Sequence, residues 1–262
     1  MRITLSIVFW TSISGFVFAQ NPEGKECAAV DDFTFIRIQY DSKGDGWSDQ
    51  RSRGRGGPWG RRGPWGTDYP AAELNFLRGV SRLTRIHTNS DPEVLRLDDD
   101  RIFQYSFLYM LEMGRNGGPE FNEKEIGNLR EYLLRGGFLL IDDFWGTYEW
   151  DTFFQAFSKV FPDRQLVELD KDHQIFHSFY DIDGPQMIPG VGHFFSGFYG
   201  GDAGITINRA LLDDHGRIMV LINWNSDIGD GWEHTYNPGY PTMYANLAYQ
   251  LGINFLIYAL TH

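Results

Sequence analysis

The sequence predicts an α/β domain with a mostly parallel sheet that is flanked by helices on both faces. The first observation behind this prediction is that apolar runs of strand length alternate along the chain with segments of helical periodicity. The second is that these runs are apolar at almost every position, as in strands that are buried on both faces. Such alternation is typical of a parallel sheet covered by helices.

Local signals place the individual elements. Asn122 and Glu125 have the spacing of a capping box at the start of one helix, and Gly136 and Gly137 end that helix. The other helices follow from apolar residues at helical spacing, and the strands follow from short apolar runs. Helices are expected at 71–83, 123–135, 150–160 and 240–260, and strands at 33–40, 105–111, 138–141, 166–169 and on both sides of the turn at 213–216.

The last helix is apolar enough to raise the alternative of a membrane span. However, Asn246, Gln250 and Asn254 recur every four residues and would form a polar stripe along it. Placing three amides in hydrocarbon is costly, because water is not there to bond them. We therefore expect this helix to pack on the sheet.

The N-terminus has the pattern of a secretory signal peptide. Arg2 precedes an apolar stretch that ends in a small-residue cleavage pattern at Ala19. Cleavage there predicts export to the periplasm or the medium, and an uncleaved membrane anchor is the alternative. The predicted organisation is a signal peptide at 1–19, an N-terminal extension at 20–32 and a single α/β domain at 33–262.

The chain is acidic, with a formal net charge of −12. Loss of Arg2 with the signal peptide would leave 22 basic against 35 acidic side chains. Such a surface repels nucleic-acid phosphates and anionic lipid, so neither is expected as the main partner. The single cysteine, Cys27, has no second cysteine in the chain with which to form a disulfide.

Several segments of the chain resemble the family called domain of unknown function 4159. These segments span about Phe33 to the C-terminus and read "FIRIQYD", "RLDDDRIFQYSFLYM", "NLREYLLRGGFLLIDDFWG", "FPDRQLVELDKDHQIFHSFYDI" and "GDGWE". The resemblance implies a class I glutamine amidotransferase-like fold, a flavodoxin-like three-layer sandwich, without an established activity. In those enzymes a nucleophilic cysteine follows the strand that here reads "GGFLLI". This chain has Asp142 and Asp143 at that turn, which excludes glutamine hydrolysis by a thiol mechanism.

The tetrapeptide Gly-Asp-Gly-Trp occurs twice, at 44–47 and 229–232, each time after a predicted strand. If these strands are parallel, both copies lie at the same sheet edge as the turn at 142–146, where open α/β sheets bind ligands. Carboxylates accept hydrogen bonds from hydroxyl groups, and indoles offer broad apolar faces. We predict one crevice with the ligand-binding residues Asp45, Trp47, Asp142, Trp145, Asp227, Asp230 and Trp232. Chance recurrence, and aspartates that only cap helices, are the alternatives.

Two further segments carry candidate chemistry. The Gly- and Arg-rich loop at 44–68 is interpreted as a disordered insertion or as a cationic lid over the acidic crevice, whereas a nucleic-acid-binding arm is disfavoured by the predicted export. His173 and His177 are one helical turn apart and are candidates to hold a metal ion. A buried histidine bonded to backbone is the structural alternative for His177, and no cofactor can be named from the sequence.

Two functional hypotheses result. The first is an exported protein that binds a polar, saccharide-like ligand or a partner protein in the crevice. The second is a hydrolase in which Asp143 or Glu233 acts as general acid or base, or in which a metal held by His and Asp activates water.

Overall fold

The protein is built on a seven-stranded sheet with the strand order β2-β1-β3-β4-β7-β6-β5. The computed structural model describes residues 32–43, 63–197, 202 and 204–262. The strands β2, β1, β3, β4 and β7 run parallel. At one edge of the sheet, β6 is antiparallel to β7, and β5 is antiparallel to β6. The strands are Ile36–Gln39 (β1), Glu93–Arg96 (β2), Phe107–Leu111 (β3), Phe138–Asp142 (β4), Leu166–Glu168 (β5), Ile207–Leu212 (β6) and Ile218–Trp224 (β7). The predicted mostly parallel α/β sheet is confirmed.

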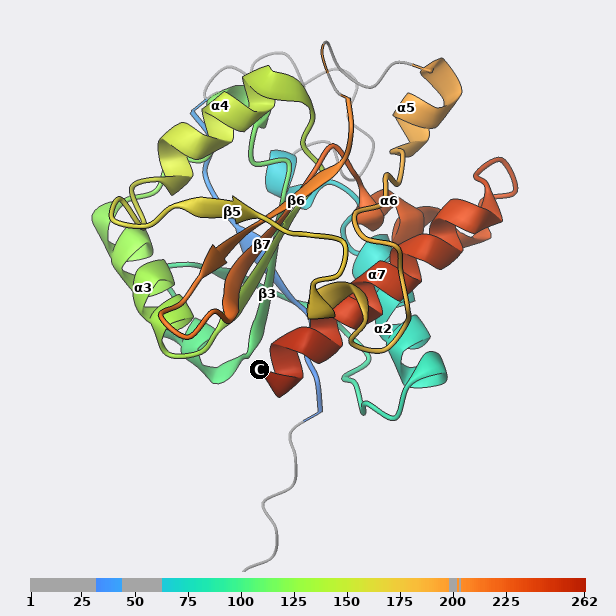
Figure 1. Ribbon diagram of the computed structural model, residues 1–262, viewed down its shortest axis with the longest axis horizontal. Helices are drawn as coiled ribbons and strands as arrows, with labels where there is room; N and C mark the ends of the chain where they lie inside the picture. The colour runs from blue at the N-terminus through green and yellow to red at the C-terminus, as the bar shows by residue number, and fades with distance from the viewer. Residues whose placement is uncertain (1–31, 44–62, 198–201, 203) are drawn as a thin grey trace, which may run out of the picture. The chain divides into compact units, whose positions relative to one another are not determined.

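Helices cover both faces of this sheet (Figure 1). On one face lie α3 (Glu123–Leu134) and α4 (Gly146–Phe157), and on the other lie α2 (Ala71–Leu83), α6 (Ile228–Glu233) and α7 (Thr242–Thr261). Side chains that alternate along each strand divide between two cores. In β4, for example, Leu140 packs in the core of α2, α6 and α7, whereas Ile141 packs in the core of α3 and α4.

The strand order changes direction between β1 and β3, where the chain crosses back past its first strand. In open α/β sheets, such a switch point leaves a crevice outside the carboxyl ends of the strands. The ends of β3, β4 and β7 lie side by side next to this point, because these strands are consecutive neighbours in the sheet. The topology therefore brings the loops after these three strands together.

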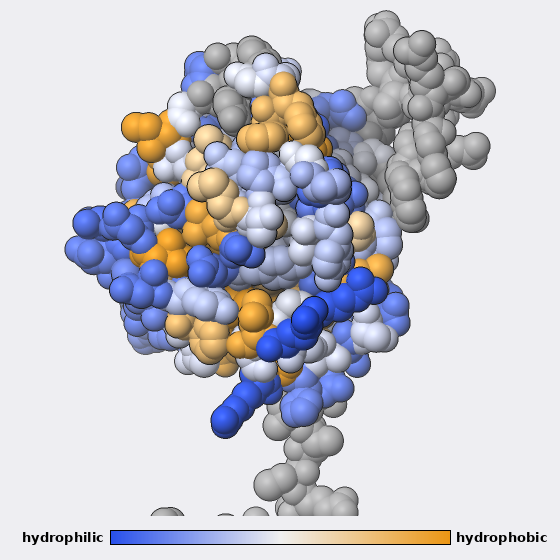
Figure 2. Space-filling view, turned by 90° about the vertical axis from the view of Figure 1, so that its right-hand side faces the viewer, coloured by the Kyte–Doolittle hydropathy of each residue, from blue (hydrophilic) through white to orange (hydrophobic). Residues whose placement is uncertain are grey.

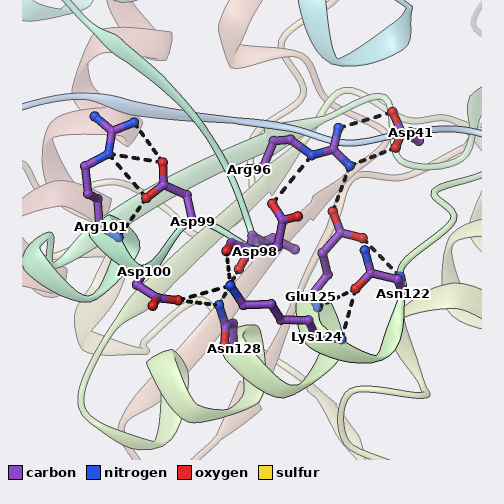
Figure 3. Close-up of polar contacts among 11 residues, drawn as sticks. Asp41, Arg96, Asp98, Asp99, Asp100, Arg101, Asn122, Lys124, Glu125 and Asn128 are labelled. Carbon is purple, nitrogen blue, oxygen red and sulfur yellow. Dashed lines mark hydrogen bonds and ion pairs between the residues drawn. The ribbon is translucent and has the colours of Figure 1, made fainter.

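The start of α3 is fixed to the neighbouring strand ends by a network of polar side chains (Figure 3). Asn122 accepts hydrogen bonds from the backbone of Lys124 and Glu125, and the Glu125 carboxylate accepts one from the Asn122 N–H at 3.0 Å. Arg96, the last residue of β2, bonds both Glu125 and Asp41, which follows β1. The predicted capping box is confirmed, and it also joins α3 to the sheet.

Helix α7 packs against α6 and the sheet, as predicted. Among the described residues, none of the helices has the length and apolarity of a membrane span. The fully buried Asn254 accepts hydrogen bonds from the backbone N–H groups of Phe179 and Tyr180 and donates to the Phe176 carbonyl. This amide therefore holds a loop on the helix. Figure 2 shows the side of the domain that is on the right in Figure 1, where apolar side chains form separate patches among hydrophilic ones.

Other element boundaries differ from the predictions. The helix expected at 150–160 is α4, which begins earlier, at Gly146. β2 and the short helix α5 (Val191–Ser196) were not predicted. The second Gly-Asp-Gly-Trp copy was expected in a loop but forms α6, because Asp227 caps it and Gly231 allows close contact with Ala248 of α7.

Candidate functional site

Three neighbouring strands end in residues with left-handed backbone. Glu112 follows β3, Asp143 follows β4 and Asn225 follows β7, and their φ angles are 50°, 49° and 60°. The turns are joined to one another, since the Glu112 N–H donates to the Asp142 and Asp143 carbonyls and the Asp143 N–H donates to the Ser226 carbonyl. Non-glycine residues in this region are strained and are typical of functional sites.

Asp142 is the buried anchor of this edge. Its Oδ2 accepts hydrogen bonds from the Tyr109 hydroxyl at 2.8 Å and the Gly229 N–H at 3.0 Å. Its Oδ1 accepts from the Asn223 amide at 2.6 Å and the Ile228 N–H at 3.4 Å. Burial raises the pKa of Asp142 to about 7, and these bonds oppose the rise. With both oxygens occupied by the protein, Asp142 positions α6 and does not offer an oxygen to a ligand.

Asp143 is nearly as buried but is directed toward a different set of groups. Its Oδ1 accepts a hydrogen bond from the Trp145 indole at 2.8 Å. Burial raises the pKa of Asp143, and the nearby Arg115 guanidinium opposes this shift. Arg115 also pairs with Glu112, whose pKa is raised by burial and by the charge of Asp143. The Trp145 ring lies against His193 of α5, with the centroids 4.4 Å apart.

Asp227 and Asp230 belong to the capped start of α6. Asp227 accepts a hydrogen bond from the Asp230 N–H at 2.7 Å, and the Asp230 Oδ2 accepts one from the Val191 N–H at 2.5 Å. Burial and the neighbouring carboxylates raise the pKa of Asp227 well above its usual value. Burial acts in the same direction on Asp230, but His234, with its Nε2 3.3 Å from the Asp230 Oδ1, lowers the pKa of this carboxyl overall.

Asp68 and Glu233 complete the group. Asp68 has a φ of 63° in the turn before α2, and that turn is held by Arg37, which donates to the carbonyls of Trp65 and Thr67. Burial raises the pKa of Asp68, and the charges of Asp230, Asp143 and Glu233 add to the effect. Burial also raises the pKa of Glu233. One oxygen each from Asp68, Asp227 and Asp230 lie within 4.8 Å of one another, as do ligand atoms of Asp230, Glu233 and His234.

We call this set of side chains the carboxylate cluster. It consists of Asp68, Glu112, Asp143, Asp227, Asp230 and Glu233. The positively charged or titratable groups beside it are Arg37, Arg115, His193 and His234. Like charges at short range raise one another's pKa, so this cluster favours protons, cations or hydrogen-bond donors as its occupants.

Comparison with protein families gives one match. The model of a domain of unknown function, DUF4159, matches residues 34–260. The chain belongs to this family. The comparison with curated proteins found none that matches. The family description states no activity, so the chemistry of this DUF4159 domain has to be argued from its own site.

The structure brings some of the predicted site residues together and excludes others. Asp143, Asp227, Asp230 and Glu233 lie in the carboxylate cluster, whereas Asp45 and Trp47 lie outside the described residues. Trp232 was expected to face a ligand. Instead it is fully buried, and its indole donates to the Ala248 carbonyl and packs on Phe76. Trp145 is 5% exposed and is bound to Asp143.

The predicted metal pair is not at this site. His173 lies beside Tyr258, whose hydroxyl accepts a hydrogen bond from Ile218, the first residue of β7. His173 is therefore at the opposite end of the parallel strands from Asp142. His177 bonds the Lys171 carbonyl, as the structural alternative expected, but it is exposed and pairs with Asp181, so the burial expected for it is wrong.

Sequence reasoning missed several members of the site in the DUF4159 domain. Glu112 directly follows a predicted buried strand, so the rule that selected Asp142 could have found it. Asp68 and His193 follow no strand, and only the folded chain brings them to the cluster. Arg115 comes three residues after Glu112 in the same loop, where a charge pair on the surface would be the ordinary interpretation.

Proposed function

We propose that this DUF4159 domain binds a small polar ligand at the carboxylate cluster. The observation that supports this most strongly is the gathering of six acidic side chains at the edge of three adjacent parallel strands. Such an arrangement is unfavourable in a protein that only has to fold, because burial and mutual repulsion both oppose the charged form. A ligand with hydroxyl or ammonium hydrogens would relieve it.

A saccharide-like ligand remains the proposed class, with different aromatic contacts from those predicted. Trp232 is removed from consideration by its burial. Phe195 on α5 and Tyr236 after α6, each two residues beyond a histidine that borders the cluster, are 65% and 70% exposed. An exposed ring beside carboxylate acceptors is the combination that a sugar ring requires, since its faces are apolar and its rim carries hydroxyl groups.

We also propose that the fold is amidotransferase-like and that Asp143 stands where those enzymes carry the nucleophilic cysteine. When the five parallel strands are numbered along the chain, their order in the sheet is 2-1-3-4-5. This order supports a flavodoxin-like sandwich. The left-handed φ of Asp143 directly after β4 supports the comparison with a nucleophile turn. A carboxylate at this position suits binding or acid–base chemistry and cannot replace a thiolate.

A hydrolase is the second candidate, and the opposed pKa shifts of Asp227 and Asp230 favour it. Asp227 is shifted upward by burial, whereas contact with His234 makes Asp230 more acidic. Neighbouring carboxyl groups with separated pKa values can act as an acid and a base in one reaction. Glu233, whose pKa is raised by burial, is a further candidate for the acid.

One substitution separates the two candidates. Asp143→Asn keeps the shape of the side chain and removes its charge. If the cluster only binds, we expect a loss of affinity of about 5–30-fold, equivalent to about 1–2 kcal/mol, in a binding screen with polyols, oligosaccharides and polyamines. If Asp143 is catalytic, turnover of ester and glycoside substrates should be abolished while affinity changes little.

The matched control is Asp100→Asn, which removes one charge from an exposed side chain that pairs with Lys124. It should bind as the wild type does. If no compound of these classes binds the wild-type protein, or if Asp143→Asn and Asp100→Asn behave alike, the proposed site is wrong.

We further propose that the protein is exported after cleavage of the signal peptide. Mass spectrometry of the protein from a periplasmic or culture fraction should then find a mature chain that begins at Gln20. Recovery of the chain only with Arg2 and the apolar stretch intact would contradict export by cleavage.

A further inference from the structure

One oxygen of the carboxylate cluster is buried without a partner. Among the described residues, the Oδ2 of Asp68 is fully buried and has no hydrogen-bond partner. A buried acceptor without a hydrogen-bond donor destabilises the fold, and more so when it is charged. Asp68 is held in this place by its left-handed backbone and by the bonds of Arg37 to the turn. The protein thus keeps an unfavourable group directed into the cluster.

Two glycines pack closely against the same oxygens. A Cβ atom on Gly229 would lie 2.9 Å from the Asp68 Oδ2 and from the Tyr109 hydroxyl, and 3.5 Å from the Asp227 Oδ1. A Cβ atom on Gly190 would lie 2.7 Å from the Asp227 Oδ2 and 3.1 Å from the Asp230 Oδ2 and from the His193 Nδ1. A side chain at either position would press on these carboxylates. The first glycine of the second Gly-Asp-Gly-Trp copy therefore allows the backbone to approach Asp68 and Asp227 closely.

The spacing of the three carboxylates matches the coordination sphere of a divalent cation. One oxygen from each of Asp68, Asp227 and Asp230 lie within 4.8 Å of one another. Oxygen ligands lie about 2.3–2.6 Å from Ca²⁺ and about 2.0–2.1 Å from Mg²⁺, so ligands of one ion are at most about 5 Å apart. Carboxylate oxygens are preferred by hard ions such as Ca²⁺, Mg²⁺ and Mn²⁺.

We propose that Asp68, Asp227 and Asp230 bind a hard divalent cation, and that the cation presents the polar ligand to the cluster. This inference rests on the proposed binding function of the cluster and names the group that would balance its charge. Arg37 acts on Asp68 but pairs with Glu73, and His234 lies beside Asp230, so a cation would add to the positive charge that faces the three aspartates. The remaining coordination positions would be open to water or to hydroxyl oxygens of the ligand.

The test is a calorimetric titration of chelator-treated protein with CaCl₂, MgCl₂ and MnCl₂ in separate runs. We expect saturable binding of at least one of these ions by the wild type and by the control Asp100→Asn. Asp68→Asn should weaken binding by at least about tenfold, since it removes one charged ligand. In metal-free buffer, the same variant should melt at the same temperature as the wild type or higher, because it removes a buried carboxyl group that Asp230, Asp143 and Glu233 repel.

A second variant covers the case in which Asp68→Asn does not fold. Gly190 has ordinary backbone angles, with φ −58° and ψ 151°, so Gly190→Ala does not strain the backbone, and its Cβ acts by displacing the side chains of Asp227, Asp230 and His193. This variant should also weaken the binding of the cation. Absence of saturable binding by the wild type, or undiminished binding by both variants, would overturn the inference. Binding that survives Asp68→Asn and disappears in His234→Ala would place the ion elsewhere and overturn it as well.

The same samples distinguish this inference from the proposed function. If the metal-free protein takes a polyol or saccharide and no cation binds, the cation inference fails and the binding function stands. If neither the cation nor the organic ligands bind, both fail.

Discussion

Replacement of Asp142 by asparagine tests whether this carboxyl is the buried anchor of the site. The side chain accepts four hydrogen bonds, two on each oxygen. An asparagine keeps one acceptor oxygen and turns an amide group toward the other two donors. At about pH 5, where the raised pKa leaves Asp142 protonated, we expect Asp142→Asn to lower the free energy of unfolding by about 1–3 kcal/mol.

The cost of this substitution should depend on pH with a definite sign. The pKa of Asp142 is about 7 in the folded protein and about 4 in an unfolded chain, so between these values the folded state holds more protons. The wild type therefore loses stability as pH rises toward 7, at up to about 1.4 kcal/mol per pH unit, and the asparagine variant lacks this loss. The difference between the two proteins should shrink from about pH 5 to about pH 8.

Denaturant unfolding at several pH values measures this difference. Asp213→Asn is the control, because the Asp213 carboxylate accepts bonds from Arg217 and the backbone that keep its pKa low despite some burial. Its effect should stay constant over this pH range, since Asp213 is ionised in both states. A difference for Asp142→Asn that is constant or grows with pH would refute the assignment of a raised pKa to this residue.

Five further substitutions probe the scaffold and the site. Gly252→Ala should destabilise the fold by about 1–3 kcal/mol in thermal unfolding, because its Cβ would lie 2.5 Å from the Trp232 ring. Gly127→Ala should stabilise the fold by about 0.5–1 kcal/mol, because Gly127 has open space around it in α3. Asn254→Ala should cost about 2–4 kcal/mol through the lost loop bonds, whereas the exposed Asn246→Ala should stay within about 0.5 kcal/mol. Asp143→Gly should raise the melting temperature, since glycine accepts the φ of 49° and the buried charge is removed. The same variant should weaken the binding of any ligand by the cluster. A variant that melts at a lower temperature would show that the carboxylate stabilises the fold.

The elements predicted correctly are those with local signals. α2 has the predicted bounds, and α3 begins at its capping box, because propensity, caps and apolar periodicity agree there. β2 was missed because "EVLR" is a short, partly exposed strand with no apolar run. α6 was missed because two glycines in four residues argue against a helix. Asp227 supplies a local cap, whereas the bonds to Asp142 and the contact with α7 exist only in the folded chain.

The site was predictable where it follows the sheet topology and unpredictable where it depends on packing. The rule that strand ends gather at one edge correctly associated Asp143 with Asp227 and Asp230. The same rule does not say which side chain of a turn faces inward. Asp142 and Trp232 were both assigned to the ligand, but one is occupied by four donors and the other fills the core beside Phe76. Large indoles are as useful for packing as for binding, and sequence alone does not separate these uses.

The relation between Asp142 and Asp143 connects the fold to the site. These residues are adjacent in the chain, and Asp143 has left-handed backbone, yet the two carboxylates bond different groups. Asp142 uses its oxygens to fix the start of α6, and that helix in turn positions Asp227 and Asp230 beside Asp143. This turn therefore supplies one aspartate as anchor and the next as part of the cluster. Because the backbone bonds between the three strand ends hold the strain in place, the cluster is organised before any ligand arrives, and a ligand would not have to supply the free energy of ordering it.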